Sequence, residues 1–218
     1  MASRKENKKT DLIKCVGLFL FICGAFILIY NYSIKERLNE ENDLKIEEFL
    51  ESNTNEEVEI LEEDNKEETT TSNVSTYNYI AVLEIPSINL KRGLVDPSSK
   101  YNNVNYNIQI IDRSTMPDVV NGNLVIAGHN GASYISFFRN LDKLNINDKI
   151  YVYYGRYKYI YSLSKTYDTP KDGNIEVYRD NSKTTITLIT CNKNSKDTQV
   201  VYIGYLDSKE IYQWVMII

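Results

Sequence analysis

The sequence predicts a mainly β domain, an eight-stranded barrel with one or two short helices, preceded by one N-terminal transmembrane helix. Three observations predict this fold. An uncharged apolar segment occupies residues 15–34, a strongly acidic segment follows at 35–76, and residues 77–218 contain short β-branched runs separated by turn residues. About eight strands in roughly 140 residues favour a closed barrel, because closure removes the unpaired edges of an open sheet.

The apolar segment CVGLFLFICGAFILIYNYSI, residues 15–34, is long enough to cross a membrane. As a helix it would be roughly 30 Å long at about 1.5 Å rise per residue, which matches a bilayer core. Residues 1–14 carry five basic residues against two acidic ones, and such a basic flank stays in the cytoplasm. We therefore predict a cytoplasmic tail at 1–14, an uncleaved signal-anchor helix at 15–34, and a catalytic domain outside the cell membrane.

Two cleavable signals are the alternatives to an anchor. A signal peptide would have a shorter apolar region, and the end of this one, AFILIYNYS, lacks a small-x-small cleavage site. A lipoprotein signal at Cys23 would need small residues before the cysteine, where this chain has Phe21 and Ile22. Both alternatives fit the residues less well than a single-pass anchor.

The acidic segment at residues 35–76 carries fifteen acidic residues against four basic ones. Its first part, 35–53, contains a few apolar residues and could form a short exposed helix. With so many like charges and so little to bury, the segment as a whole is predicted to be an extended extracytoplasmic linker.

The domain at residues 77–218 reads as strands in order along the chain. Runs of β-branched and aromatic residues occur at 77–90, 121–130, 149–168, 185–191 and 199–206. The first is predicted to form two strands around a turn at Pro86, and the third a hairpin centred on Gly155. Only SYISFFRNLDKLN, residues 133–145, has helical spacing of its apolar residues.

Charge and cysteine content exclude two kinds of function for this domain. Its sixteen basic residues against thirteen acidic ones form no basic cluster, so nucleic-acid binding has no support. Cys15 and Cys23 fall in the apolar segment, which leaves Cys191 without a partner for a disulfide in the outer domain. An unpaired cysteine outside the membrane is expected to be either reactive or buried.

The single histidine, His129, and Cys191 occupy equivalent places, each where an apolar strand enters a polar loop. Each residue alone is more often structural, but the paired placement favours chemistry. An imidazole can take the proton of a thiol or stabilise the thiolate, which makes the sulfur a nucleophile. One His and one Cys cannot fill a tetrahedral metal site, and no CxxC or HxxxH spacing occurs. Acyl transfer is therefore the better interpretation, and it needs a donor for the oxyanion, expected after Cys191.

These residues resemble the sortases, the membrane-anchored cysteine transpeptidases of Gram-positive bacteria. TLITC at 187–191 and AGH at 127–129 are similar to the paired signatures of that family. The resemblance extends over about residues 77–207, through LEIPSINL, STMPDVVNGNLVIAGHN, FFRNLDKLNINDKIYV and QVVYIGYL in the family's order and spacing.

The resemblance implies an eight-stranded barrel and a thiol-protease chemistry without metal or organic cofactor. Cys191 would attack the threonine carbonyl of an LPXTG-like sorting motif in a secreted protein. His129 would protonate the departing amine, and an amine of a cell-wall precursor would resolve the acyl-thioester. One N-terminal span and a short connection before TLITC resemble class A or D rather than class B or C.

The chain departs from the family at one position. Sortases usually carry an arginine at the start of the strand after the cysteine, and Gln199 falls there. A glutamine amide donates a neutral hydrogen bond but cannot supply the forked, charged contact of a guanidinium. Gln199 is our candidate for this role.

Other side chains could take the place of this arginine. The alternatives are Lys193, Lys196, Arg113 and Arg139, although Arg139 is expected to pack or cap within 133–145. If none of them serves, the chain would be a catalytically impaired receptor for sorting peptides. Another type of Cys/His peptidoglycan transpeptidase is disfavoured, since its histidine closely precedes the cysteine, whereas here they are 62 residues apart.

Overall fold

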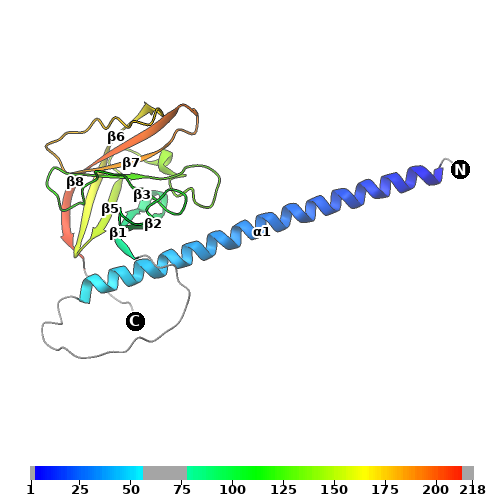
Figure 1. Cartoon of the computed structure of the whole chain (residues 1–218), viewed down its shortest axis with the longest axis horizontal. Helices are drawn as coiled ribbons and strands as arrows, with labels where there is room; N and C mark the ends of the chain where they lie inside the picture. Colours follow the sequence, from blue (N-terminus) through cyan, green and yellow to red (C-terminus); the bar gives the residue numbers. More distant parts are fainter. Residues whose placement is uncertain (1–2, 56–77, 213–218) are drawn as a thin grey trace. The chain divides into compact units, whose positions relative to one another are not determined.

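A computed structural model of the chain describes residues 3–55 and 78–212 (Figure 1). The elements in chain order are α1 (Ser3–Asn55), β1 (Tyr79–Ile85), the 3-10 helix η1 (Pro86–Ile88), β2 (Leu90–Val95), β3 (Gln109–Ile110), β4 (Asn123–Ala127), the 3-10 helix η2 (Leu141–Lys143), β5 (Lys149–Tyr154), β6 (Tyr157–Pro170), β7 (Thr185–Cys191) and β8 (Thr198–Ile211). Residues 56–77, which comprise part of the predicted linker and the first residue of the predicted barrel domain, lie outside the described residues.

The eight strands form one sheet that curls into a nearly closed barrel, with the order β2-β1-β5-β6-β8-β7-β4-β3. The two end strands are linked through Asn107, whose side-chain amide donates to the Gly93 carbonyl at 2.7 Å and accepts from Arg92 Nε at 3.3 Å. Side-chain hydrogen bonds of Asn107 thus connect the β2 and β3 ends of the sheet, which do not pair through a backbone ladder. The prediction of a mainly β, eight-stranded barrel with one or two short helices is confirmed.

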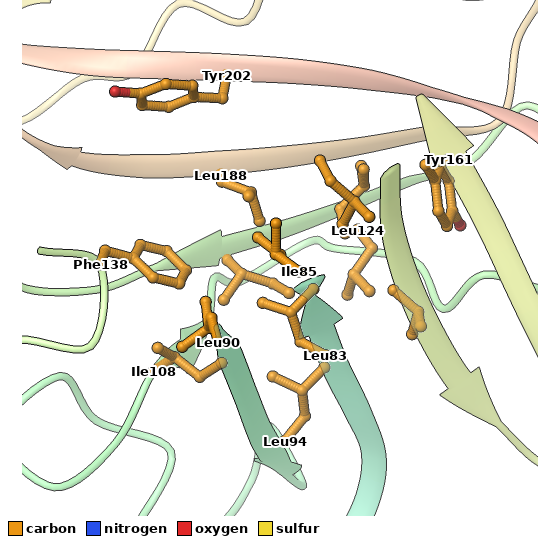
Figure 2. Close-up of a cluster of buried hydrophobic side chains, with 14 of the residues drawn as sticks. Leu83, Ile85, Leu90, Leu94, Ile108, Leu124, Phe138, Tyr161, Leu188 and Tyr202 are labelled. Atoms are coloured by element: carbon orange, nitrogen blue, oxygen red, sulfur yellow. The ribbon is translucent and has the colours of Figure 1, made fainter. Parts of the chain in front are cut away.

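The barrel interior is filled by large apolar side chains from many of the strands (Figure 2). Leu83, Leu124 and Leu188 come from β1, β4 and β7 and are fully buried. Tyr161 of β6 is the largest fully buried side chain. Since burial of apolar area is the main favourable term in folding, this core fixes the strand ends on which any site depends.

Strand β7 is buried on both faces. Ile186 and Leu188 belong to the interior core, while Ile189 packs on the outer face with Val201, and Val177 of the β6–β7 connection packs against that cluster. A strand covered on both sides needs a nearly continuous apolar and β-branched run, which TITLITC provides. The connection at residues 171–184 therefore acts as a cover over β7 and β8.

Both predicted turns are present. Strands β1 and β2 pair as an antiparallel hairpin around η1, which begins at Pro86. Strands β5 and β6 pair with Tyr154 opposite Tyr157, and Gly155 in the turn has φ of +55°. A positive φ is readily adopted by glycine, which explains its place at the centre of this hairpin.

The prediction of a helix over residues 133–145 is wrong apart from the single turn η2. The backbone N–H of Phe138 donates to the carbonyl of His129 at 2.9 Å, outside any local helix. Leu141 N–H then bonds three residues back to Phe138. The helical spacing arose because Phe138 and Leu141 both point into the barrel core, which a compact loop achieves equally well.

Helix α1 contributes to two compact units, Met1–Glu41 and Asn42–Ile218. The described stretch Lys14–Asn53 includes an apolar region of mean hydropathy 2.1 that is not buried in the protein. By length and composition it could cross a membrane, a property shared by anchors and N-terminal signal sequences.

The end of α1 forms the helix that was considered possible for residues 35–53, but one face of that helix is buried rather than exposed. Residues 35–55 are helical, and Ile46, Phe49 and Leu50 are buried in a cluster with Tyr79 and Val82. Their spacing places three apolar side chains on one helix face, while the acidic residues between them stay exposed. Burial of this face outweighs the repulsion of like charges, so the compact unit begins at Asn42 rather than at residue 77.

Asn42 itself is hydrogen-bonded to the strands. Its side-chain oxygen accepts from Tyr79 Oη at 3.1 Å and from the Gly93 N–H at 3.3 Å. Its side-chain nitrogen donates to the Lys91 carbonyl at 3.2 Å. These bonds fix the register of the docked helical segment against β1 and β2.

Candidate active site

Four strand ends meet at one edge of the barrel. Strands β4 and β7 are parallel neighbours, so both end there, and β8, antiparallel to β7, begins there. Strand β6 runs antiparallel to β8 and also ends there. Cys191 is the last residue of β7, and His129 follows β4 by two residues. The topology thus brings the two predicted catalytic residues to the same edge.

Hydrogen bonds tie the segments carrying His129 and Cys191 together. The Gly128 N–H donates to the Ile189 carbonyl at 3.1 Å, and the buried Thr190 hydroxyl donates to the Gly128 carbonyl at 2.7 Å. The side-chain amide of Asn130 donates to the Cys191 carbonyl. Gly128, Asn130 and Thr190 are therefore held across the β4–β7 junction, and Cys191 and His129 are themselves half-buried.

Arg139 supports the loop that follows His129. Its Nε donates to the Gly131 carbonyl at 2.9 Å and its Nη2 to the Ser133 carbonyl at 2.8 Å. This guanidinium is thus engaged with loop backbone, which agrees with the structural role expected for it. It holds in place the chain that leads from His129 to the core residue Phe138.

Gln199 lies directly opposite Cys191 in the β7–β8 ladder. Opposed residues of an antiparallel pair project on the same face, so the two side chains leave the sheet together. The Gln199 amide donates to the carbonyls of Pro170 and Asn174 at 3.4 and 3.5 Å. Both contacts are long and therefore weak, and they are made to the end of β6 and to the β6–β7 connection.

Lys171 is a residue at this edge that the sequence analysis missed. Its Nζ lies 3.4 Å from Cys191 Sγ, a hydrogen-bond contact to sulfur. Its backbone N–H donates to the Asp197 carbonyl at 2.8 Å, which fixes the residue where β6 ends. The candidates from the sequence were the residues after Cys191 and two arginines, Arg113 and Arg139, whereas Lys171 precedes Cys191 by twenty residues. The only available signal was its place directly after a long strand, and the strand order was needed to use it.

The two lysines in the loop that follows Cys191 are placed differently from Lys171. Lys193 forms a 2.7 Å ion pair with Asp142 next to η2, whereas Lys196 is exposed. Asn192 donates to Asp168 at 2.7 Å and so joins the start of this loop to β6. The ion pair and this hydrogen bond therefore connect the loop after β7 to Asp142 on one side and to β6 on the other.

The described residues offer no metal site, and one further pocket lies away from the barrel edge. Within residues 14–53 and 78–212, no group of three or more His, Cys, Asp or Glu side chains could hold a metal ion. A pocket of about 690 Å³ is lined by residues that include Phe49, Tyr79, Met116 and Tyr154. None of the residues discussed at the barrel edge lines it, so this pocket is separate from the candidate site.

Comparison with known proteins identifies the family. The family model of the sortase domain matches residues 83–206, more than half of the chain. The chain belongs to the sortase family. A curated relative, sortase A of Bacillus anthracis, is 25% identical over 201 residues, covering 89% of this chain and 93% of the relative. Sortases are known as cell-wall transpeptidases, so this chain is a member of a cysteine transpeptidase family.

Solved sortase structures share the fold. Sortase A of Listeria monocytogenes superposes with a TM-score of 0.53 at 21% identity, covering 62% of this chain and 91% of that one. The sortase D5 transpeptidase of Clostridium perfringens gives 0.52 at 24% identity, covering 60% and 80%. The predicted sortase-type barrel and the family resemblance are confirmed, whereas the class A or D arrangement stays a prediction.

Proposed function

We propose that this sortase is a membrane-anchored cysteine transpeptidase that cleaves an LPXTG-like sorting motif in secreted proteins. It would do so through an acyl-thioester on Cys191 and transfer the acyl group to an amine of the cell wall. The observation that carries the proposal is the parallel β4–β7 junction. There His129 and Cys191 follow adjacent strands, and the residues beside them are hydrogen-bonded to each other.

The proposed reaction proceeds in two acyl transfers. The Cys191 thiolate forms a C–S bond to the threonine carbonyl carbon, and the C=O π electrons move to oxygen. When the carbonyl reforms, the C–N bond breaks and His129 gives a proton to the departing amine. An incoming amine then attacks the thioester, passes its proton to His129 and displaces the thiolate. Because the second step reverses the proton path of the first, one histidine serves both.

Gln199 is proposed as a neutral donor at the position where the resemblance implies an arginine. Its place opposite Cys191 supports this role, since the side chain leaves the same face as the thiol. In the free enzyme its amide contacts two carbonyls only at 3.4–3.5 Å. Such weak contacts are readily exchanged for a hydrogen bond to substrate.

The apolar part of α1 is proposed as a single-pass anchor with residues 1–14 in the cytoplasm and the barrel outside. Its length and mean hydropathy of 2.1 support a span, and the basic residues before it support the orientation. Protease added to intact cells should digest the barrel, whereas an epitope at residue 1 should be protected until the cells are permeabilised. Protection of the barrel would contradict this topology.

The function is tested with the full chain in detergent micelles and a fluorogenic LPXTG-type peptide. Cleavage is expected, together with a mass increase on Cys191 equal to the acyl fragment. Addition of an amine acceptor should release that fragment as a new amide. Cys191→Ala and His129→Gln should abolish turnover while leaving the circular dichroism spectrum unchanged.

The alternative function gives a different outcome in the same experiment. Peptide binding without cleavage, with Cys191 unmodified for a panel of such peptides, would identify a sorting-peptide receptor and overturn the transpeptidase proposal.

A further inference from the structure

The contact between Lys171 and Cys191 is unusual because it places an ammonium group against a thiol that the proposed chemistry needs as an anion. Lys171 Nζ lies 3.4 Å from Sγ. The lysine follows Pro170, the last residue of β6, and reaches Cys191 across the start of β8. We propose that Lys171 is a catalytic residue that supplies the positive charge of the Cys191 site. This inference rests on the proposed function.

A positive charge can stabilise an anion at two stages of the reaction. The attacking sulfur is a thiolate, and the substrate carbonyl oxygen becomes an oxyanion when the C–S bond forms. That oxygen is bonded to the carbon that Sγ attacks, so it lies two bonds from the sulfur. A cation in contact with Sγ is therefore within reach of the oxyanion as well. Lys171 donates to the thiolate first and to the oxyanion next, and it keeps its own proton throughout.

The position of Lys171 is fixed by its backbone. The Lys171 N–H donates to the Asp197 carbonyl at 2.8 Å, across to the β7–β8 loop. The preceding carbonyl, that of Pro170, accepts from Gln199 at 3.4 Å. The lysine stem thus starts from an anchored residue, whereas its ammonium remains exposed and can shift by the small distance between sulfur and oxyanion.

Two other basic side chains close to this edge, Lys193 and Arg139, are engaged elsewhere. Lys193 is paired with Asp142 at 2.7 Å, and Arg139 donates to the carbonyls of Gly131 and Ser133. Arg179 donates to Asn121 and Lys183 carbonyls near the opposite end of β7. Within residues 78–212, Lys171 is the cation in hydrogen-bond contact with Sγ of Cys191.

The first test measures the charge at the thiol without any substrate. The full chain is alkylated with iodoacetate, which is anionic, and with iodoacetamide, which is neutral, and modification of the Cys191 peptide is followed by mass spectrometry. Lys171→Met should lower the ratio of the iodoacetate rate constant to the iodoacetamide rate constant by about threefold, as expected for the loss of an exposed charge pair. Lys171→Arg should keep the ratio near that of the wild type. Lys183→Gln, which removes an equal charge at the far end of β7, should leave it unchanged.

The second test measures acyl transfer to the LPXTG-type peptide. Lys171→Met should slow formation of the Cys191 thioester by about 100-fold, the usual effect of removing an oxyanion donor. Lys171→Arg should stay within about tenfold of the wild type, because a cation of similar reach remains. The Lys183→Gln control should acylate normally.

The outcomes separate this inference from the proposed function. An unchanged alkylation ratio in Lys171→Met, or a wild-type acylation rate in that variant, would overturn the role of Lys171 while leaving the transpeptidase proposal intact. A third outcome is a lowered alkylation ratio in Lys171→Met when the wild-type chain forms no thioester with any peptide. That result would support the contact of the cation with the thiol. It would overturn its role at the oxyanion together with the proposed function.

Discussion

The Thr190 hydroxyl donates a buried 2.7 Å hydrogen bond to the carbonyl of Gly128. Thr190 immediately precedes Cys191, and Gly128 immediately precedes His129, so one bond joins the two predicted catalytic residues through their neighbours. It crosses from β7 to the end of β4, where the backbone ladder stops. The relative position of thiol and imidazole therefore depends on a side chain that takes no part in the chemistry.

Replacing this hydroxyl should loosen the junction. Thr190→Val keeps the shape but leaves a buried carbonyl without its donor, which costs about 1–3 kcal/mol of unfolding free energy. We expect a lower melting temperature, and a fall in kcat of about tenfold with little change in KM, because positioning rather than peptide binding is impaired. Thr166→Val, at an exposed position of β6, is the matched control and should behave as wild type. Equal kcat values in the two variants would contradict this role.

Gln199 and Lys171 can be separated by mutation. Gln199→Ala should lower acyl transfer strongly while the melting temperature stays unchanged, because the lost contacts are 3.4 Å or longer. In Lys171→Met, the further change Gln199→Arg should restore most of the acylation rate, since residue 199 projects on the same face as Cys191. If Gln199→Ala turns over as fast as the wild type, Gln199 has no role in the site. If the double variant shows no recovery, a charge at position 199 cannot replace Lys171.

The docked end of α1 should be part of the stability of the barrel. Leu50 is 1% exposed and Leu44 is 67% exposed on the same helix. Leu50→Ala is expected to reduce the free energy of unfolding by about 2–5 kcal/mol through lost burial and a cavity. Leu44→Ala should change it by less than about 0.5 kcal/mol. Denaturant unfolding followed by tyrosine fluorescence measures both, and equal effects would mean that the helical segment does not contribute to this unit.

Tyr202 should make the barrel sensitive to alkaline pH. Burial, with smaller effects of Asp142 and Asp168, raises the pKa of Tyr202 to about 12 from its ordinary value of 10.0. The folded protein keeps this proton while the unfolded chain loses it, so the stabilisation is complete below pH 10 and is lost between pH 10 and 12. At pH 11 the loss is about 1.4 kcal/mol.

Urea unfolding at pH 9 and pH 11 measures this loss. Tyr202→Phe should reduce the difference in unfolding free energy between the two pH values by that amount, and Tyr106→Phe, at an exposed position, should leave it unchanged. The same pH dependence in all three proteins would show that Tyr202 does not titrate as described.

The local features of the fold were predictable because the sequence carries them locally. Alternation and β-branched runs placed β1, β4, β7 and β8, Gly155 placed the β5–β6 turn, and twenty uncharged residues placed the apolar part of α1. Prediction failed where the same apolar spacing is compatible with either a helix or a compact loop. Phe138 and Leu141 have helical spacing but reach the core from a loop, because His129 supplies the hydrogen-bond acceptor that a helix would otherwise provide.

The end of α1 shows the opposite failure. The charge of residues 35–55 predicted an exposed segment with at most a short helix, yet Ile46 and Leu50 pack against an apolar surface on β1 and β2. Charge is visible in the sequence, whereas the surface that compensates for it is formed only by the folded barrel. Local composition therefore indicated the exposed charges and a possible helix in this segment, but not the docking of that helix.

By itself the sequence determined the family, the nucleophile candidate and the strand exits, because motifs, residue types and alternation are properties of neighbouring residues. Only the tertiary structure decided which groups meet at Cys191. Strand order places the end of β6 beside the start of β8, and this brings Lys171 to 3.4 Å from the sulfur. No spacing along the chain encodes that contact, since it depends on pairing between strands that are distant in sequence.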